Sequence, residues 1–471
     1  MRIAVVGGGI SGLAAAYRLR QALPQARLTI FEAAPQWGGV IASRRRQGAL
    51  CELGPDSLLR KPAALSLIHD LGLDDELRAT RPEARRALIV HGQELLPIPE
   101  GFYLLAPGRI WPFLRSPLVS VRGKLRMALD LLLPARDPAA PDESLAGFVR
   151  RRLGAEALAR LAQPLVAGIT TADPEQLSVA AVFPQLIAME SRHRSLLMAM
   201  RARLHDSPAS GARYGLFATL AGGMQRLTDA LVASLASTPE VCTLRHSTAV
   251  TALECSAAGA RRTGNPALPA VRLTTAHGPW QGERVVLALP AHASARLVRG
   301  LDGPLADLLD SIPYAPVATV NLAWPRSACL GLPAAAGFVV PAAEGRALLA
   351  ATFADQKFDG RAAPGQMLVR AFLGGALRPQ LVAHSDDELA VIATREVAEL
   401  LHIAVPPLWS LVARYPQAMP QYTVGHQRRL AAIETRAAAH PPLALLGNGF
   451  TGIGIGDLCA AADALSRRWR A

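Results

Sequence analysis

A glycine-rich run near the start of the chain is the feature that most restricts its fold. Residues 2–6 are predicted to form a short buried strand, residues 13–23 a helix, and residues 28–31 a second strand that ends at Glu32. The turn after the first strand carries the pattern G-x-G-x-x-G, at Gly7, Gly9 and Gly12. Such glycines permit close approach to a pyrophosphate, the helix N-terminus offers free N–H groups, and the acidic side chain accepts hydrogen bonds from ribose hydroxyls. With these parts in register, the sequence predicts a dinucleotide-binding fold rather than a chance glycine turn.

The residues after Glu32 indicate which dinucleotide is bound. A second glycine pair, Gly38-Gly39, follows closely, and an extended stretch leads on to residues 52–57. A nicotinamide-binding fold would usually continue into another crossover helix. The observed order resembles the FAD-binding half of the amine-oxidase-like flavoproteins instead, so FAD is the favoured cofactor and NAD is the alternative.

Length and composition set limits on the class of protein. The 471 residues are enough for two or three domains. No run approaches the roughly 18 uninterrupted apolar residues of a membrane-spanning helix, and the first residues carry no basic leader. We therefore expect a cytoplasmic protein that attaches, at most, peripherally to the cytoplasmic face of a membrane. The five cysteines lie far apart without a C-x-x-C pattern, which favours reduced thiols over a disulfide framework or a zinc site.

The net charge of +13 has two interpretations. All but three of the 50 basic residues are arginine, and richness in arginine and alanine often reflects genome base composition. A basic surface also favours anionic ligands or an anionic membrane face. Nucleic acid is not an expected partner, because no basic-aromatic binding module is present.

Residues 95–134 differ in character from their surroundings. They are apolar, interrupted by prolines and interspersed with arginines, and they include Phe102, Tyr103, Trp111 and Phe113. Three interpretations stay open, namely the lining of an apolar substrate cavity, a surface that dips into a membrane, and ordinary core beneath loops.

The pattern of helices and strands returns to the dinucleotide-binding fold twice after leaving it. The predicted helices cover residues 145–153, 155–165, 179–200 and 458–469. The predicted strands cover residues 249–253, 271–275, 284–289, 318–322, 367–373 and 443–446, with a glycine- and proline-rich loop at 259–269. We therefore predict an α/β fold with a Rossmann-like FAD-binding domain assembled from three segments, 1–90, 213–290 and 426–471. Two insertions interrupt this domain. The first is helical and covers residues 91–212, and a membrane-facing role is one interpretation of it. The second is an α+β substrate domain at 291–425.

Several longer motifs make a family resemblance specific. The chain resembles the flavin-dependent protoporphyrinogen oxidases, including the bacterial type that acts on coproporphyrinogen III. The matching stretches span nearly the whole chain: ELGPDS at 52–57, ADPEQLS at 172–178, FP at 183–184, HRSL at 193–196, RAF at 370–372, MPQYTVGH at 419–426 and the glycine turn at 447–457.

The resemblance implies a set of residues that contact non-covalently bound FAD. They are Gly7, Gly8, Gly9, Ile10, Ser11, Gly12, Glu32, Ala33, Gly38, Gly39, Val40, Gly54, Pro55, Asp56, Ser57, Val250, Tyr415, Ile453, Gly454 and Ile455. In the resemblance, Val250 meets the adenine through its backbone, and residues 453–455 present N–H groups near the flavin ring. Two positions depart from the family pattern, since Val40 is often basic and Tyr415 often tryptophan in relatives. No cysteine or histidine adjoins the expected ring contacts, so we expect no covalent link.

The implied reaction is the oxidation of a porphyrinogen to a porphyrin in heme biosynthesis. Six electrons leave the substrate, dioxygen accepts them, and hydrogen peroxide is formed. The flavin performs the electron chemistry, so neither a metal nor a catalytic side chain is expected. His426 is a potential base, although a structural hydrogen bond is the favoured interpretation.

The macrocycle requires an apolar slot, and its propionates require cations. Phe102, Tyr103, Leu165, Met367 and Phe372 are the apolar candidates, and Lys61, Arg370 and Arg60 are the cationic ones. Each of them has an ordinary alternative role, as core packing or as solvated charge. Phe372 stands where some coproporphyrinogen-type relatives have tyrosine, which favours protoporphyrinogen IX. Lys61 matches a basic pair of the coproporphyrinogen-type relatives and favours the substrate with four propionates.

Other functions remain as alternatives at this point. An amine oxidase or a carotenoid desaturase would share the flavoprotein fold, but only Phe450 represents the aromatic pair expected of an amine oxidase near the last glycine turn. A flavin-containing scaffold or a porphyrin carrier would not catalyse a reaction. The oligomeric state stays open.

Overall fold

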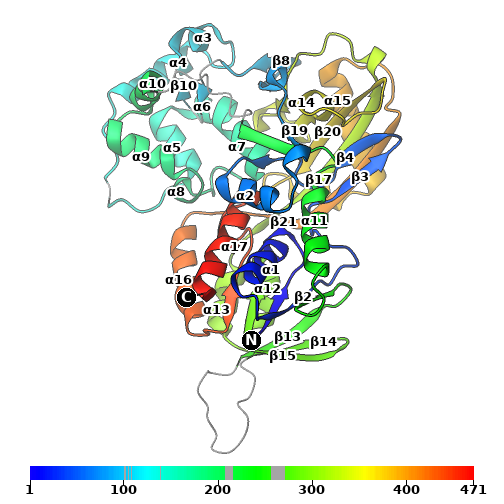
Figure 1. The fold of residues 1–471 in the computed structure, drawn as a ribbon. Helices are drawn as coiled ribbons and strands as arrows, with labels where there is room; N and C mark the ends of the chain where they lie inside the picture. Colours follow the sequence, from blue (N-terminus) through cyan, green and yellow to red (C-terminus); the bar gives the residue numbers. More distant parts are fainter. Residues whose placement is uncertain are drawn as a thin grey trace, which may run out of the picture.

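The computed structural model describes residues 1–99, 102–103, 106–107, 109–137, 139–206, 216–255 and 271–470. Figure 1 shows a lower lobe that contains both chain termini, and an upper part in which a large sheet stands beside a group of helices. The loop predicted at 259–269 lies outside the described residues.

The lower lobe is built on a five-stranded parallel sheet whose strands come from widely separated parts of the chain. The strand order is β12 (Cys242–Arg245), β2 (Arg27–Phe31), β1 (Arg2–Val6), β16 (Arg284–Leu287) and β22 (Leu443–Leu445). Side chains of the central strand alternate between two buried clusters, with Ile3 and Val5 in one and Ala4 and Val6 in the other. Both faces of the sheet are therefore covered, as expected for a parallel sheet.

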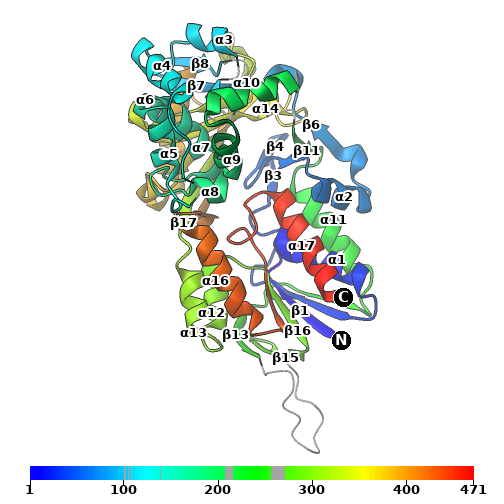
Figure 2. The ribbon, with the colours of Figure 1, turned by 90° about the vertical axis from the view of Figure 1, so that its left-hand side faces the viewer.

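Helices cover one face of this sheet, and helices with a small sheet cover the other. The first face packs against α1 (Ile10–Ala22), α11 (Gln225–Ala236) and α17 (Ile455–Arg470), which lie side by side in Figure 2. The second face packs against α12 (Ala291–Val298), α13 (Gly303–Asp310), α16 (His426–Ala438) and the antiparallel sheet of β13 (Val250–Cys255), β14 (Val271–Thr275) and β15 (Gly278–Gly282). Residues of α12 and α13 therefore pack on the lower lobe, although the second insertion was predicted to begin at residue 291.

The upper sheet has seven strands. Its order is β21 (Trp409–Pro420), β17 (Tyr314–Pro325), β20 (Gln366–Gly374), β19 (Leu348–Phe353), β18 (Gly337–Val339), β7 (Ala87–His91) and β8 (Glu94–Pro97). One face packs on α15 (Asp386–Leu401), whose first turn is closed by a capping box between Ser385 and Glu388. β7 pairs in parallel with β18, so the first segment of the lower lobe ends before Ala87 rather than at residue 90.

The helical insertion forms its own hydrophobic core. It contains α3 (Ile110–Arg115), α4 (Val121–Ala128), α5 (Leu145–Arg152), α6 (Ala155–Ala157), a π-helical turn at Leu158–Ala162, α7 (Gln163–Thr170), α8 (Val179–Val182), α9 (Pro184–His193) and α10 (Leu196–Asp206). The single helix predicted at 179–200 is wrong: Pro184 begins a new helix, and Arg194 adopts a left-handed conformation with φ 62°. None of the helices in the described part of the chain has both the length and the apolar character needed to cross a bilayer.

Short elements connect these three parts. They are the hairpin of β3 (Ser43–Arg46) and β4 (Ala49–Glu52), the sheet of β5 (Leu58–Leu59), β11 (Phe217–Leu220) and β6 (Leu77–Ala79), the pair β9 (Phe102–Tyr103) and β10 (Ala106–Pro107), and the helices α2 (Pro62–Asp70) and α14 (Ala354–Lys357). The loop between β4 and β5 lies where the lower lobe meets the upper sheet, and the candidate site is built around it.

Candidate cofactor and substrate site

The first glycine turn has the shape that a pyrophosphate requires. A β-carbon at Gly12 would lie 1.9 Å from the carbonyl oxygen of Gly7, whereas one at Gly9 would meet nothing within 4 Å. α1 opens with Ile10 and Ser11, directly after Gly9, which has no side chain to cap the free N–H groups of the first turn. Gly12 is therefore needed for packing, and Gly9 leaves open space beside a positive helix end. These features fit a bound dinucleotide such as FAD.

The second glycine pair lies against the first turn. Gly38 forms a parallel bridge with Gly9, and a β-carbon at Gly39 would lie 3.3 Å from the Cα of Gly9. A β-carbon at Gly54 would lie 1.7 Å from the carbonyl oxygen of Val40. The structure thus brings together three of the predicted cofactor segments, at residues 7–12, 38–40 and 54–57.

Glu32 lies at the end of β2 beside the same turn. Its carboxylate accepts hydrogen bonds from the backbone N–H groups of Gly8 and Ala34, both at 2.7 Å. Ala33 is exposed next to it. The loop that leads into Val250, the first residue of β13, reaches this corner because a backbone amide of that loop donates to the carbonyl of Glu32. These contacts hold the carboxylate where a ribose would approach.

The upper sheet holds the loop after β4 through its carbonyl groups. Arg370 donates to the carbonyl oxygens of Leu53 and Gly54, Thr319 donates to Leu53 at 3.1 Å, and Asn321 donates to the preceding carbonyl at 3.2 Å. Arg370 is 4% exposed, and its Nε has no partner within the described part of the chain. In the structure, Arg370 therefore supports the loop after β4, whereas the sequence predicted that it pairs with a propionate.

An ion pair between buried Lys357 and half-buried Asp56 fixes the remainder of this loop. The Nζ of Lys357 lies 3.0 and 2.8 Å from the two carboxylate oxygens of Asp56, and Ser57 donates to Asp56 at 2.7 Å. Burial raises the pKa of Asp56, but Lys357 and Arg370 outweigh it and hold this pKa well below its usual range. Sequence reasoning missed Lys357, and the only available signal was its rarity as one of three lysines.

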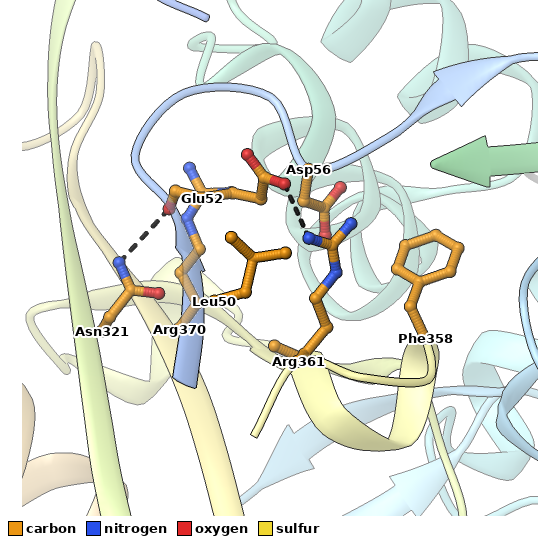
Figure 3. Close-up of a pocket in the computed structure, with 8 residues that line it drawn as sticks. Leu50, Glu52, Asp56, Asn321, Phe358, Arg361 and Arg370 are labelled. Carbon is orange, nitrogen blue, oxygen red and sulfur yellow. Dashed lines mark hydrogen bonds and ion pairs between the residues drawn. The ribbon is translucent and has the colours of Figure 1, made fainter. Parts of the chain in front are cut away.

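A second buried pair lies next to the first. Arg361 donates to Glu52 at 2.9 Å, and Figure 3 shows both side chains lining a small cavity together with Asp56 and Arg370. The Glu52 carboxylate also accepts hydrogen bonds from Ser43 and from a backbone amide at the start of α11. Burial raises the pKa of Glu52, and Arg361 opposes the shift. This group of charges joins the lower lobe to the upper sheet beneath the predicted cofactor loop.

Two predicted aromatic residues share one face of the upper sheet. Tyr415 on β21 and Phe372 on β20 lie on the same face as Arg370, because their partners on β17 alternate in register. The guanidinium of Arg370 lies 4.8 Å from the centre of the Phe372 ring. Burial raises the pKa of Tyr415, which keeps its phenol neutral. This face points toward the loop after β4.

The other predicted substrate residues are not gathered on that face. Met367 lies on the opposite face of β20, fully buried in the core beneath α15, because strand side chains alternate. Leu165 is half-buried on α7. Phe102 stacks on Phe113 at 6.4 Å within the core of the insertion, and the side chain of Tyr103 lies outside the described residues.

The last glycine turn leads into α17 beside Lys61. The ammonium of Lys61 pairs with Asp457 in the first turn of that helix, and its stem packs against the helix backbone. Ile453 and Gly454 precede the helix and Ile455 begins it. The backbone N–H groups at this helix start are the ones that the resemblance assigns to contacts with the flavin ring.

His426 is buried at the start of α16. It is 1% exposed, and its Nε2 has no partner among the described residues. Burial and the neighbouring Arg429 lower its pKa to about 4, so the ring is neutral at pH 7. The ring lies flat against Tyr422, with 4.1 Å between the ring centres.

Comparisons with known proteins identify the family and the relatives that this chain resembles. The model of the family described as flavin containing amine oxidoreductase matches residues 10–457. Coproporphyrinogen III oxidase of Propionibacterium freudenreichii is 34% identical over 492 residues, which cover 98% of this chain and 89% of the relative. Coproporphyrinogen III oxidase of Bacillus subtilis is 31% identical, with 98% of both chains covered. A solved structure from Exiguobacterium sp. 255-15, provisionally named a protoporphyrinogen oxidase, has a TM-score of 0.85 at 29% identity and covers 100% of this chain and 98% of its own.

The match extends over nearly the whole chain and includes the glycine turns and the loop that form the site. The chain therefore belongs to the flavin containing amine oxidoreductases, in the branch of relatives named protoporphyrinogen and coproporphyrinogen III oxidases, and is a flavin-dependent oxidoreductase.

Proposed function

We propose that this protein oxidises a porphyrinogen to the corresponding porphyrin in heme biosynthesis, with non-covalently bound FAD and with dioxygen as the electron acceptor. The observation that carries the proposal is a full-length relationship to enzymes named for this reaction, combined with a glycine-lined site that fits FAD. Each oxidation removes a hydride from a methylene bridge and a proton from a pyrrole N–H. Three such steps with tautomerisation remove six electrons, and three molecules of dioxygen are reduced to hydrogen peroxide.

The residues of the chain bind and shield the reactants. When bound, FAD supplies the hydride acceptor. The open space at Gly9 would receive its pyrophosphate, and Glu32 would accept hydrogen bonds from its adenosine ribose. Phe372 and Tyr415 form an aromatic wall that would exclude water from the substrate side. The porphyrinogen supplies much of the driving force itself, because the cation left by hydride loss is delocalised over two pyrroles.

We propose protoporphyrinogen IX as the preferred substrate. Phe372 gives the wall no hydroxyl group, and Lys61 is already paired with Asp457, so it is not a free cation for an additional propionate. Coproporphyrinogen III is the second candidate, because the bacterial relatives at 31% to 34% identity are named for it.

Steady-state kinetics with both substrates test these proposals. Purified protein loaded with FAD is given protoporphyrinogen IX or coproporphyrinogen III, and porphyrin fluorescence is followed together with peroxide. We expect a higher kcat/KM for protoporphyrinogen IX and little effect of Lys61→Ala on the ratio of the two values. A wild-type preference for coproporphyrinogen III that Lys61→Ala removes would reverse the choice of substrate. Inactivity on both substrates would refute the porphyrinogen-oxidase proposal.

We also propose that the insertion attaches the protein peripherally to an anionic membrane. Large apolar side chains on α3, α4 and the residues after α4 are exposed: Trp111 by 72%, Val121 by 73%, Leu125 by 66% and Leu132 by 75%. Arginines are interspersed among them, and the net charge of the chain is +13. Exposed apolar residues rimmed by basic groups suit the headgroup region of an anionic bilayer.

A further inference from the structure

The segment that follows β21 connects all three parts of the molecule. Its backbone bonds to the helical insertion, where the amide of Ser178 donates to the carbonyl of Tyr422 at 2.8 Å and the amide of Val424 donates to Gln176 at 2.9 Å. The side chain of Gln421 donates to the carbonyl of Thr170, the last residue of α7, at 3.3 Å. These residues are therefore bonded to the helical insertion before the chain returns to the lower lobe.

The hydroxyl of Tyr422 extends from this anchored segment to the glycine turn at 447–454. It donates to the carbonyl oxygen of Asn448 and accepts a hydrogen bond from the N–H of Gly452 at 3.0 Å. One oxygen atom therefore joins two points of the turn that are four residues apart. Burial raises the pKa of this phenol, so it keeps the proton that it donates.

The position of the Tyr422 ring is itself fixed. His426, the first residue of α16, stacks on it with an interplanar angle of 12°, and Tyr422 packs against the hydrophobic core of the insertion. The amide of Gly425 donates to Asp142 of the insertion at 2.8 Å, which fixes the backbone between the two rings. The phenol therefore reaches the turn from a rigid support.

The turn needs such a support because it is rich in glycine. Gly447 and Gly452 have φ values of 143° and 117°, in the region that favours glycine, and glycine loses the most conformational freedom on ordering. The turn is tied to the strand β21 by a second bond, from the side chain of Asn448 to the carbonyl of Ala418 at 3.2 Å. The N–H groups at 453–455, which follow directly, depend on the same geometry.

We propose that Tyr422 is a positioning residue that orders the last glycine turn and thereby sets the N–H groups of residues 453–455 for the flavin ring. This inference rests on the placement of the ring in the proposed function. It requires no assumption about which porphyrinogen is oxidised.

The variant Tyr422→Phe removes the hydroxyl and keeps the ring stack. Apo-protein is titrated with FAD while flavin fluorescence is followed, and the reduction potential of the bound flavin is measured. We expect FAD affinity to fall on the order of tenfold, as the loss of buried hydrogen bonds implies, and the potential to shift. The matched control is Tyr17→Phe, which removes a buried hydroxyl bonded to the carbonyl of Asp70 at 3.2 Å in the same lobe.

The outcomes separate positioning from a general loss of stability. If Tyr422→Phe and Tyr17→Phe lower the melting temperature similarly and both leave FAD affinity and potential unchanged, the proposal is wrong. Hydrogen exchange of wild-type apo-protein gives a test that does not depend on the folding of a variant. The Gly452 amide should be protected, and exchange at the rate of an open loop would also overturn the proposal. Because none of these readouts uses a porphyrinogen, inactivity on porphyrinogens would count against the proposed function alone.

Discussion

The largely buried ion pair of Lys357 and Asp56 allows a quantitative test of how the loop between β4 and β5 is held. Lys357 is 8% exposed, and its Nζ lies 2.8 Å from the nearer oxygen of Asp56. The variant Lys357→Met keeps much of the side-chain volume but leaves the half-buried carboxylate without its principal partner. Removal of one partner of a buried pair usually costs about 3–5 kcal/mol. Arg370 still opposes the charge of Asp56, and the Asp56 side chain is 21% exposed, so we expect a cost at the lower end, about 3 kcal/mol.

This cost corresponds to a measurable change in thermal stability. An unfolding entropy of roughly 2.1 cal/mol/K per residue gives about 1 kcal/mol/K for a chain of this length, so the melting temperature should fall by about 3 °C. Circular dichroism at fixed excess FAD measures the transition. The ratio of flavin to protein absorbance after gel filtration should also fall, because the pair supports the loop that contains Gly54 and Ser57.

A double variant shows whether the effect comes from the unpaired charge. Asp56→Asn combined with Lys357→Met removes both charges and should be more stable than the sum of the two single effects predicts, by at least about 1 kcal/mol. Arg299→Met, which breaks an exposed ion pair with Asp307, should leave the melting temperature unchanged. A single variant as stable as wild type, or strictly additive effects, would refute the reasoning.

Four further substitutions give three separate tests. Gly9→Val should fold, because its β-carbon meets nothing within 4 Å, but it should lose flavin absorbance at 450 nm. Gly12→Val should fail to fold, because its β-carbon would lie 1.9 Å from a carbonyl oxygen. Equal flavin content in Gly9→Val and wild type would contradict the proposed cofactor site. His426 has a pKa near 4 in the folded state, below its unfolded value, so its contribution to stability is present above pH 6.5 and is lost as the pH falls through 4. His426→Phe should therefore flatten the decrease of melting temperature between pH 7 and pH 4 and retain turnover, and loss of turnover with intact flavin binding would instead indicate a base. Trp111→Ser should weaken binding to vesicles that contain anionic lipid, measured by co-sedimentation, and high salt should release the wild type; retention of the wild type until detergent is added would show that the attachment is not peripheral.

The local architecture of the cofactor lobe was readable from the sequence because it depends on near neighbours. The strand, glycine turn and helix at the N-terminus follow from hydrophobic pattern and glycine spacing, and β1 and β2 match the prediction to within one residue. The helix ends were less predictable, since α1 begins three residues earlier than predicted and the helix expected at 179–200 is three helices. Such ends depend on caps and on local breaks at residues such as Pro184 and Arg194.

For the site, some residues could be predicted from the sequence, and others became apparent only from the tertiary structure. The glycines and Glu32 could be predicted as cofactor residues because a pyrophosphate and a ribose impose local spacing. Lys357, Arg361 and Tyr422 were not predicted as parts of the site. Their partners lie 301, 309 and 26 or 30 residues away, and no periodicity in one chain encodes such pairings. For the same reason, the sequence did not distinguish Met367 from Phe372. Only the register of β20 between α15 and the cofactor loop decided that one side chain lies in the core and the other on the face of the site.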